Sequence, residues 1–301
     1  MATVIFSKSN KKLAASLAKS LNCELGRIYT KHFADGEIMV KSGSDVKNKD
    51  IIIIQSTSKD VQEELFSLLL LLDSIKRSGA RSIKLVMPYF AYSRQERVSW
   101  TNEPVSCEVV AKIIDTADFD ALYTFDLHHP IIETFFKHPI YNLPTTEIFA
   151  KYYQNYLQKH CISPSDVVII SPDHGSNTRA NMLSRALGNI NIVIMDKVRP
   201  TPNAAEHLEI DGNKVKDKVC LIIDDIVDTG GTIVSASKLL YSHGAKKVLV
   251  GASHAVLSNG AYSRLNAANV VDLVVTNSIE KNLNKNINVI DIKELIEEVM
   301  G

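Results

Sequence analysis

Residues 219–232 read VCLIIDDIVDTGGT, and this stretch decides how the chain is interpreted. Its five apolar residues, 219–223, are typical of a strand that is buried on both faces of a parallel sheet. The apolar run stops at two adjacent carboxylates, Asp224 and Asp225, and the stretch closes with Thr-Gly-Gly-Thr. Because ligands of open parallel sheets bind beyond the carboxyl ends of the strands, we expect the polar half of this stretch to line a crevice.

The rest of the chain alternates apolar runs with segments of helical periodicity. Runs at 51–55, 83–89, 121–127 and 167–172 are separated by segments such as VQEELFSLLLLLDSIKRSGA. Continuous apolar strands separated by helices indicate a parallel sheet with helices on both faces. The sequence therefore predicts an α/β fold.

One crossover unit is used twice along the chain. IIIIQSTS at 51–58 and CLIIDDIVDTGGT at 220–232 each lead into a helix that ends at Gly-Ala and returns as a strand. We therefore predict two similar domains, residues 1–144 and 145–301, joined near LPTTE at 143–147. The acidic pair and the glycines occur in the second copy alone, so we expect the chemistry to concentrate there.

Charge and hydropathy exclude several classes of protein. Lys+Arg and Asp+Glu number 34 each, so no basic field favours nucleic acid as a partner. The longest apolar run, 68–72, is far shorter than the ~20 residues of a membrane span, and the N-terminal segment has no signal-peptide core. The four cysteines are widely spaced, as expected for reduced thiols. We expect a cytoplasmic protein with no nucleic-acid or membrane partner.

The Thr-Gly-Gly-Thr segment has the properties of an anion-binding turn. Gly230 and Gly231 allow backbone N–H groups to approach a phosphate, Thr229 and Thr232 add hydroxyl donors, and a helix expected from near Ile233 adds its dipole. The lysine pattern of nucleotide P-loops and the GxGxxG dinucleotide fingerprint are both missing from the sequence.

The neighbouring carboxylates narrow the ligand further. Asp224 and Asp225 would repel a phosphate unless they hold a magnesium ion or accept hydrogen bonds from sugar hydroxyls. The simpler alternative is a capped strand-to-helix turn, but such a turn needs one carboxylate, whereas Asp228 makes three here. The residues predict a sugar phosphate with vicinal hydroxyls as ligand.

IIDDIVDTGGT resembles the ribose-phosphate-binding signature shared by phosphoribosyltransferases and by ribose-phosphate diphosphokinases, also called PRPP synthases. The resemblance runs over nearly the whole chain and implies two phosphoribosyltransferase-like domains. It also implies transfer of the diphosphoryl group of ATP to the C1 hydroxyl of ribose 5-phosphate. Five further segments resemble the diphosphokinase motifs in order and spacing: FADGEIMV (33–40), PYFAYSRQER (88–97), FDLHHP (125–130), SPDHGSNTRA (171–180) and DKVRPTPN (196–203).

The resemblance assigns the ATP contacts to the first domain. Phe33 is expected to stack on adenine, Asp35 and Glu37 to make polar contacts, and Arg94 and Gln95 to bind ATP. In the family the first of these loops reaches into a neighbouring subunit, which implies a homo-oligomer with a shared ATP site. Without the resemblance, the Asp-Gly pair is an ordinary hairpin turn and RQER is a solvated charge cluster.

The resemblance also assigns metal and catalytic roles. His128 and Asp173 correspond to Mg²⁺ ligands, and Lys197 and Arg199 to the catalytic cations; His129 has no such counterpart and is expected to be structural or exposed. Taken alone, SPDHGSNTRA is equally an N-capping turn, and DKVRPTPN is a flexible linker. The ribose 5-phosphate site falls on Asp224, Asp225, Asp228, Thr229, Gly230, Gly231 and Thr232.

Two features depart from the family pattern. VSWTNEP at 98–104 replaces a basic loop, and the chain stops at EEVMG without an obvious counterpart of the common regulatory segment. Both departures bear on whether phosphate activates the protein and whether nucleoside diphosphate inhibits it. Two alternative functions stay open: a phosphoribosyltransferase, which leaves the first domain without a role, and a catalytically silent regulatory partner of a synthase, against which the retained motifs argue.

Overall fold

The computed structural model describes residues 3–198, 207–258 and 260–300. Within these residues the chain forms two compact units, each built around a mainly parallel sheet with helices packed against it. The prediction of two similar α/β domains is therefore confirmed.

Segments from both ends of the chain contribute to the first unit. The chain up to Leu143 is joined there by Ser278–Glu280 and by the segment that begins at Lys293. The carbonyl oxygen of Ser278 accepts hydrogen bonds from Asn10 Nδ2 at 2.9 Å and from Ser56 Oγ at 2.6 Å. The second unit consists of Pro144–Asn277 and Lys281–Ile292.

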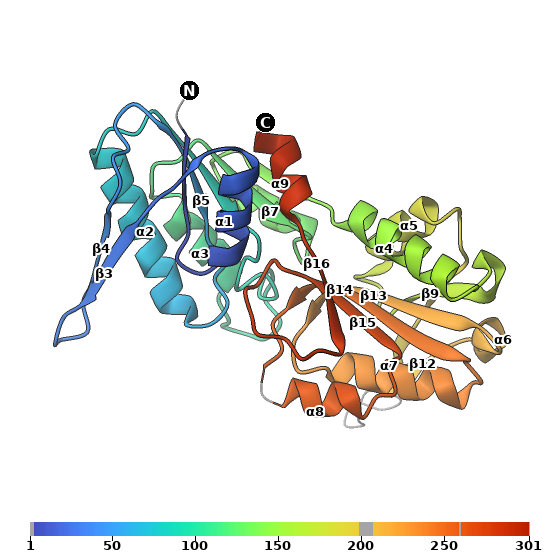
Figure 1. Ribbon diagram of the computed structural model, residues 1–301. Coiled ribbons are helices and arrows are strands. Elements are labelled where there is room, and N and C mark those ends of the chain that lie inside the picture. Colours follow the sequence, from blue (N-terminus) through green and yellow to red (C-terminus); the bar gives the residue numbers. More distant parts are fainter. Residues whose placement is uncertain (1–2, 199–206, 259, 301) are drawn as a thin grey trace. The chain divides into compact units, whose positions relative to one another are not determined.

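The first unit has a parallel sheet whose strands lie in the order β2-β1-β5-β6-β7-β8 (Figure 1). Two further strands, β3 and β4, form an antiparallel hairpin. The apolar runs predicted from the sequence are the central strands, and their side chains are almost fully buried. The elements are β1 (Thr3–Phe6), α1 (Lys11–Ser20), β2 (Glu24–Leu25), β3 (Ile28–His32), β4 (Ile38–Ser42), β5 (Asp50–Ile54), α2 (Val61–Arg77), β6 (Ser82–Met87), α3 (Ser106–Ile114), β7 (Ala121–Phe125), the 3-10 helix η1 (Pro130–Phe135), β8 (Ile140–Leu143) and α9 (Lys293–Met300).

The second unit repeats this arrangement, with strands in the order β10-β9-β13-β14-β15-β16. Two more strands, β11 and β12, form an antiparallel ribbon. The elements are α4 (Thr146–Lys159), the 3-10 helix η2 (Pro164–Asp166), β9 (Val167–Ser171), α5 (Asn177–Ala186), β10 (Ile192–Ile194), β11 (Asp196–Val198), β12 (His207–Glu209), α6 (Gly212–Val215), β13 (Val219–Val227), α7 (Gly231–Ser242), β14 (Lys247–Ala255), α8 (Ala261–Asn266), β15 (Asp272–Thr276) and β16 (Ile287–Ile290).

Both faces of the second sheet are covered, which explains why its strands are continuously apolar. Cys220 and Ile222 of β13 pack with side chains of α7 and α8 in one apolar cluster. Leu221 and Ile223 pack in a second cluster with side chains of α4 and α5. These two helices lie on the other side of the sheet from α7 and α8 (Figure 1). Alternate residues of one strand therefore enter two different cores.

Two expectations concern the chain as a whole. Across the described ranges no helix is both long enough and apolar enough to cross a membrane. The four cysteines, at positions 23, 107, 161 and 220, are free thiols, as predicted.

Candidate active site

Strand β13 runs further than the sequence predicts. The apolar run ends at Ile223, but the strand continues to Val227, because β14 pairs with it in parallel as far as Ala255. Asp224 is paired with Ala252 inside this ladder and is half-buried, and Asp225 is 3% exposed. The expectation that both carboxylates leave the strand at residue 223 is therefore wrong.

Helix α5 and the turn before it contact the acidic pair. Ser176 Oγ donates a 2.9 Å hydrogen bond to Asp224 Oδ1, while Ser176 N donates a 3.0 Å bond to Asp173 Oδ1. Arg179 Nη1 lies 3.7 Å from Asp225 Oδ1. The structure thus brings Asp173 and the acidic pair together through Ser176 and Arg179. Neither residue stood out in the sequence, although both lie inside the SPDHGSNTRA motif.

The acidic pair has perturbed electrostatics. The pKa of the Asp224 carboxyl is raised to about 7, first because burial removes water from the charged form and second because the Asp225 carboxylate lies beside it. The positive charge of Arg179 and the hydrogen bond from Ser176 act in the opposite direction. A cation placed at this pair would relieve the repulsion between the two carboxylates and favour their ionised form.

The predicted anion-binding turn lies at the N-terminus of α7. The helix begins at Gly231, two residues before the predicted start, and its first turn contains no acidic side chain. Gly230 has a φ of 78°, a backbone conformation that favours glycine. Thr229 and Thr232 are both exposed. The turn therefore presents hydroxyl and backbone donors together with the positive end of a helix dipole.

The two predicted catalytic cations are only partly described. The backbone of Lys197 lies in β11, where it pairs with Leu208 of β12. Asp196, the preceding residue, contacts His174 through a 2.9 Å link between Oδ1 and Nε2. The start of β11 is thereby tied to the turn that carries the predicted metal ligand Asp173. Arg199 lies outside the described residues.

In the first unit, the FADGE segment is the tip of the β3–β4 hairpin, as the Asp-Gly pair indicated. Phe33 N donates to Glu37 O at 2.9 Å, and Gly36 N donates to Phe33 O at 3.0 Å. Glu37 N also donates to Asp35 Oδ1 at 3.1 Å. The Phe33 ring is 44% exposed, and Lys31 Nζ lies 4.8 Å from its centroid. An exposed aromatic ring beside a cation is available for stacking on a flat ligand.

The other predicted ATP and metal residues follow adjacent strands of the first sheet. Arg94 and Gln95 lie in the segment after β6 and His128 follows β7; all three are exposed. Because β6 and β7 are parallel neighbours, these segments leave the same edge of the sheet. His129 is structural, as predicted, since its Nδ1 accepts a 3.1 Å hydrogen bond from Ile131 N at the start of η1.

The two predicted metal ligands belong to different units, His128 to the first and Asp173 to the second. In the described part of the chain, no group of three or more His, Cys, Asp or Glu side chains is arranged to hold a metal ion. Asp173, Asp224 and Asp225 nevertheless offer carboxylate oxygens, the ligand type that Mg²⁺ prefers. The donor chemistry of the second unit therefore fits a magnesium ion.

The turn after β5 occupies the corresponding place in the first unit, but it is closed. Glu64 of α2 accepts hydrogen bonds through Oε2 from Ser58 N at 2.6 Å and Lys59 N at 3.2 Å. Thr57 Oγ1 accepts a 3.1 Å bond from Ala91 N, and the Ser56 hydroxyl is bonded to Ser278 O. The chain's own groups thus satisfy the donors of this turn.

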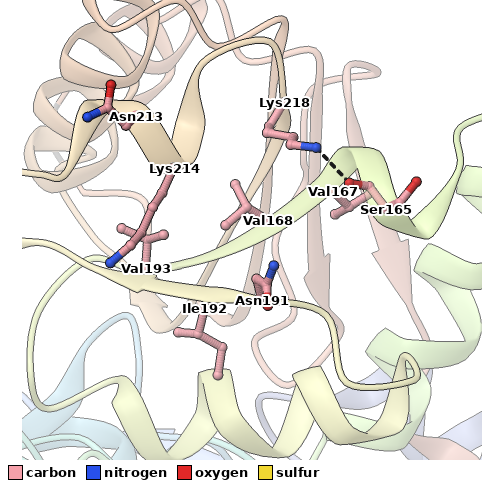
Figure 2. Close-up of a pocket in the computed structure, with 9 residues that line it drawn as sticks. All are labelled: Ser165, Val167, Val168, Asn191, Ile192, Val193, Asn213, Lys214 and Lys218. Atoms are coloured by element: carbon pink, nitrogen blue, oxygen red, sulfur yellow. Dashed lines mark hydrogen bonds between the residues drawn. The ribbon is translucent and has the colours of Figure 1, made fainter.

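The cavity in Figure 2 lies at the opposite edge of the second sheet. Its volume is about 400 Å³, and it opens near the first residues of β9, β10 and β13. Lys218 Nζ donates to Ser165 O at 2.7 Å, and Lys214 Nζ lies 3.2 Å from Asp211 Oδ2. Because ligands of parallel sheets bind at the carboxyl edge, we do not place the active site in this cavity. Its lining consists of Ser165, Val167, Val168, Asn191, Ile192, Val193, Asn213, Lys214 and Lys218.

Comparisons with known proteins identify the family. The model of the N-terminal domain of ribose phosphate pyrophosphokinase matches residues 2–117, and that of the phosphoribosyl transferase domain matches 135–283. A ribose-phosphate pyrophosphokinase 1 from Listeria monocytogenes is 43% identical over 276 residues, which cover 91% of this chain and 85% of the relative.

A second relative and a solved structure agree with these matches. The ribose-phosphate pyrophosphokinase of Bacillus caldolyticus is 40% identical over 296 residues, covering 97% of this chain and 91% of the relative. The crystal structure of phosphoribosylpyrophosphate synthetase from Mycobacterium smegmatis has a TM-score of 0.90 at 29% identity, covering 99% and 97% of the two chains. This chain, with its doubled fold and its acidic, glycine-bearing turn, belongs to the ribose-phosphate pyrophosphokinase family.

Proposed function

We propose that this chain transfers the diphosphoryl group of ATP to the C1 hydroxyl of ribose 5-phosphate, giving 5-phosphoribosyl 1-diphosphate and AMP. The C1 oxygen attacks the β-phosphorus, and the bond from that phosphorus to the oxygen bridging the α- and β-phosphates breaks. Besides family membership, one observation carries the proposal: α7 begins with exposed threonines and no acidic side chain in its first turn, and it follows the strand that carries Asp224 and Asp225.

The turn from Asp228 to Thr232 would hold the 5-phosphate of the sugar. Its support is the exposure of Thr229, Gly231 and Thr232 at a helix N-terminus without an acidic first turn. Asp224 and Asp225 would bind the ribose diol, directly or through magnesium. Hydrogen bonds from sugar hydroxyls would then offset the electrostatic repulsion between the two carboxylates.

Magnesium is the proposed cofactor, with His128 and Asp173 as its ligands. When bound, the ion neutralises the charge of the triphosphate and polarises the phosphoryl group that is transferred. The chain's own side chains have a separate task, which is to position the sugar so that C1 points along the line of attack.

The ATP side of the reaction is proposed for the first unit. Phe33 would stack on adenine, Asp35 and Glu37 would make polar contacts, and Arg94 and Gln95 would bind the nucleotide. We further propose a homo-oligomer in which this hairpin serves a neighbouring subunit. Lys197 and Arg199 would stabilise the charge that develops during transfer. We place the enzyme in the cytoplasm, where its free thiols stay reduced.

The proposal is tested by mixing the protein with ATP, Mg²⁺ and ribose 5-phosphate and measuring AMP. We expect AMP only when the pentose phosphate is present. A phosphoribosyltransferase would instead require a nucleobase and release pyrophosphate, and a silent regulatory subunit would release neither product. Lys197→Ala serves as the matched variant, because equal AMP formation by variant and parent excludes the catalytic role given to that lysine. Repeating the assay with and without inorganic phosphate tests for activation.

A further inference from the structure

Helix α8 and the segments around it pack behind the anion-binding turn of α7. Arg264, exposed on α8, donates a 2.7 Å hydrogen bond from Nε to the carbonyl oxygen of Thr229. A Cβ at Gly230 would lie only 3.0 Å from Leu265 Cγ, so the turn and this helix are in close contact. The contact joins residues 35 positions apart in the sequence.

The hydrogen bond from Arg264 to Thr229 O fixes the direction in which the Gly230 N–H points. A peptide unit is planar and trans, so the carbonyl of Thr229 and the N–H of Gly230 point in opposite directions from one rigid plane. With Arg264 bound to the carbonyl, the Gly230 N–H must point away from α8. The guanidinium charge also polarises this peptide, which makes the N–H a stronger donor to an anion.

Asp228, at the start of the same turn, also interacts with side chains of later segments of the chain. The hydroxyl of Ser258 donates to Asp228 Oδ1. Lys281 Nζ donates to Val256 O, and to Leu257 O at 3.0 Å, and its charge interacts with that of Asp228. These contacts keep a carboxylate that would repel a phosphate engaged with donors of the protein.

We propose that Arg264 is a positioning residue for the sugar-phosphate site, fixing the Thr229–Gly230 peptide with the Gly230 N–H turned toward the bound phosphate. Ser258 supports it by holding Asp228. The inference rests on the proposed function for the identity of the ligand. Arg264 does not touch the substrate in this scheme, so its removal weakens pentose-phosphate binding without altering the ATP contacts of the first unit.

The test compares the parent protein with Arg264→Ala, Arg264→Lys and Arg77→Ala. Arg77 is the matched control, since its Nε likewise donates a 2.8 Å hydrogen bond, to Asp73 of α2 in the other unit. Loss of a charged hydrogen bond predicts that R264A raises KM for ribose 5-phosphate about tenfold, with KM for ATP changed less than about twofold. R264K should recover part of the loss, and R77A should match the parent.

Two further measurements separate positioning from general damage. Hydrogen exchange of the Gly230 amide should accelerate in R264A and stay unchanged in R77A. Should R264A fail to fold, Ser258→Ala should raise KM for ribose 5-phosphate alone, and Ser258→Thr should restore it.

The outcomes distinguish this inference from the proposed function. Calorimetric titration with ribose 5-phosphate, without ATP, measures the sugar-phosphate site by itself. If the parent binds the sugar phosphate but forms no AMP, the proposed function fails and the inference stands on the affinities. Equal affinity in parent and R264A, or equal changes in both KM values, overturns the positioning role.

Discussion

The turns after β5 and after β13 connect equivalent strands and helices, yet one is closed and the other open. In the first unit, Glu64 of α2 accepts hydrogen bonds from the amides of Ser58 and Lys59, which precede the N-cap residue Asp60. In the second unit, α7 has no acidic residue in its first turn, whereas the first turn of α2 contains Glu63 and Glu64. We propose that this element serves stability in the first unit and binding in the second.

The comparison of the two turns indicates which helix N-termini can bind a ligand. Every helix begins with amides that lack an intrahelical partner, and a carboxylate of the chain is a ready acceptor for them. In the first unit a carboxylate of α2 bonds to the amides just before the helix, whereas we propose that the turn before α7 leaves this place to a ligand. We infer that an anion site in this fold is a helix start whose first turn contains no acidic side chain.

The largest effect is expected from closing the open turn with a carboxylate. Thr232→Glu places a negative charge on the exposed first turn of α7, where it stabilises the helix but repels a phosphate. A repulsion of about 4 kcal/mol would lower kcat/KM for ribose 5-phosphate roughly a thousandfold. Steady-state kinetics and thermal melting measure the two effects. The neutral control Thr232→Gln should lose much less activity; equal losses in both variants would show that charge is not the cause.

The acidic pair beside the open turn should make stability depend on pH. The pKa of Asp224 is raised to about 7 by burial and by Asp225, so the folded state binds a proton that the unfolded chain releases near pH 4. The free energy of unfolding therefore falls as pH rises from about 4 to about 7, by at most about 4 kcal/mol for this group. Asp224→Asn should remove that fall. Urea titrations of parent and variant across this range measure the difference, and parallel curves would contradict the assignment.

Strain at the open turn is tested with Gly230→Ala. The substitution imposes a φ of 78° on an alanine and brings its Cβ to 3.0 Å from Leu265 Cγ. We expect a loss of about 2 kcal/mol in unfolding free energy, together with weaker binding of ribose 5-phosphate. Gly188→Ala is the control, with a φ of 89° and no described atom within 4 Å of the added Cβ. A loss no larger than that of the control would remove the packing argument.

The smallest effect is expected from weakening the closed turn. Glu64→Gln keeps an acceptor near Ser58 and Lys59 but removes the charge. We expect a loss of about 1 kcal/mol in unfolding free energy, with KM for ribose 5-phosphate unchanged. Chemical denaturation and kinetics measure both. A raised KM for the pentose phosphate would end the division of roles between the two turns.

The sequence predicted correctly those features of the fold that depend on residues close together in the chain. The buried strands, the Asp-Gly hairpin, the structural role of His129 and the glycine turn before α7 each depend on a few consecutive side chains. The end of β13 does not, because it follows from the length of β14, its pairing partner. Periodicity in one segment contains no information about the length of another, so Asp224 and Asp225 were placed too near the solvent.

The sequence also did not predict which side chains from other segments contact the site residues. Ser176 and Arg179 contact the acidic pair of β13 from the start of α5, and Arg264 and Ser258 contact the turn from a later crossover. Serine and arginine are common on helices and loops, so their types alone signal nothing. What marks them is the atom each one bonds to, which only the fold reveals.

The participation of Ser278 in the first unit has a consequence for synthesis on the ribosome. Asn10, which donates to its carbonyl, is made 268 residues earlier, and α9, which also belongs to that unit, is made later than Ser278. Domains generally fold as they emerge, the N-terminal one first. Here the domain that leaves the exit tunnel first can be completed only after Ser278 and α9 have been made, and an expression fragment cut at Leu143 would emerge without these two segments.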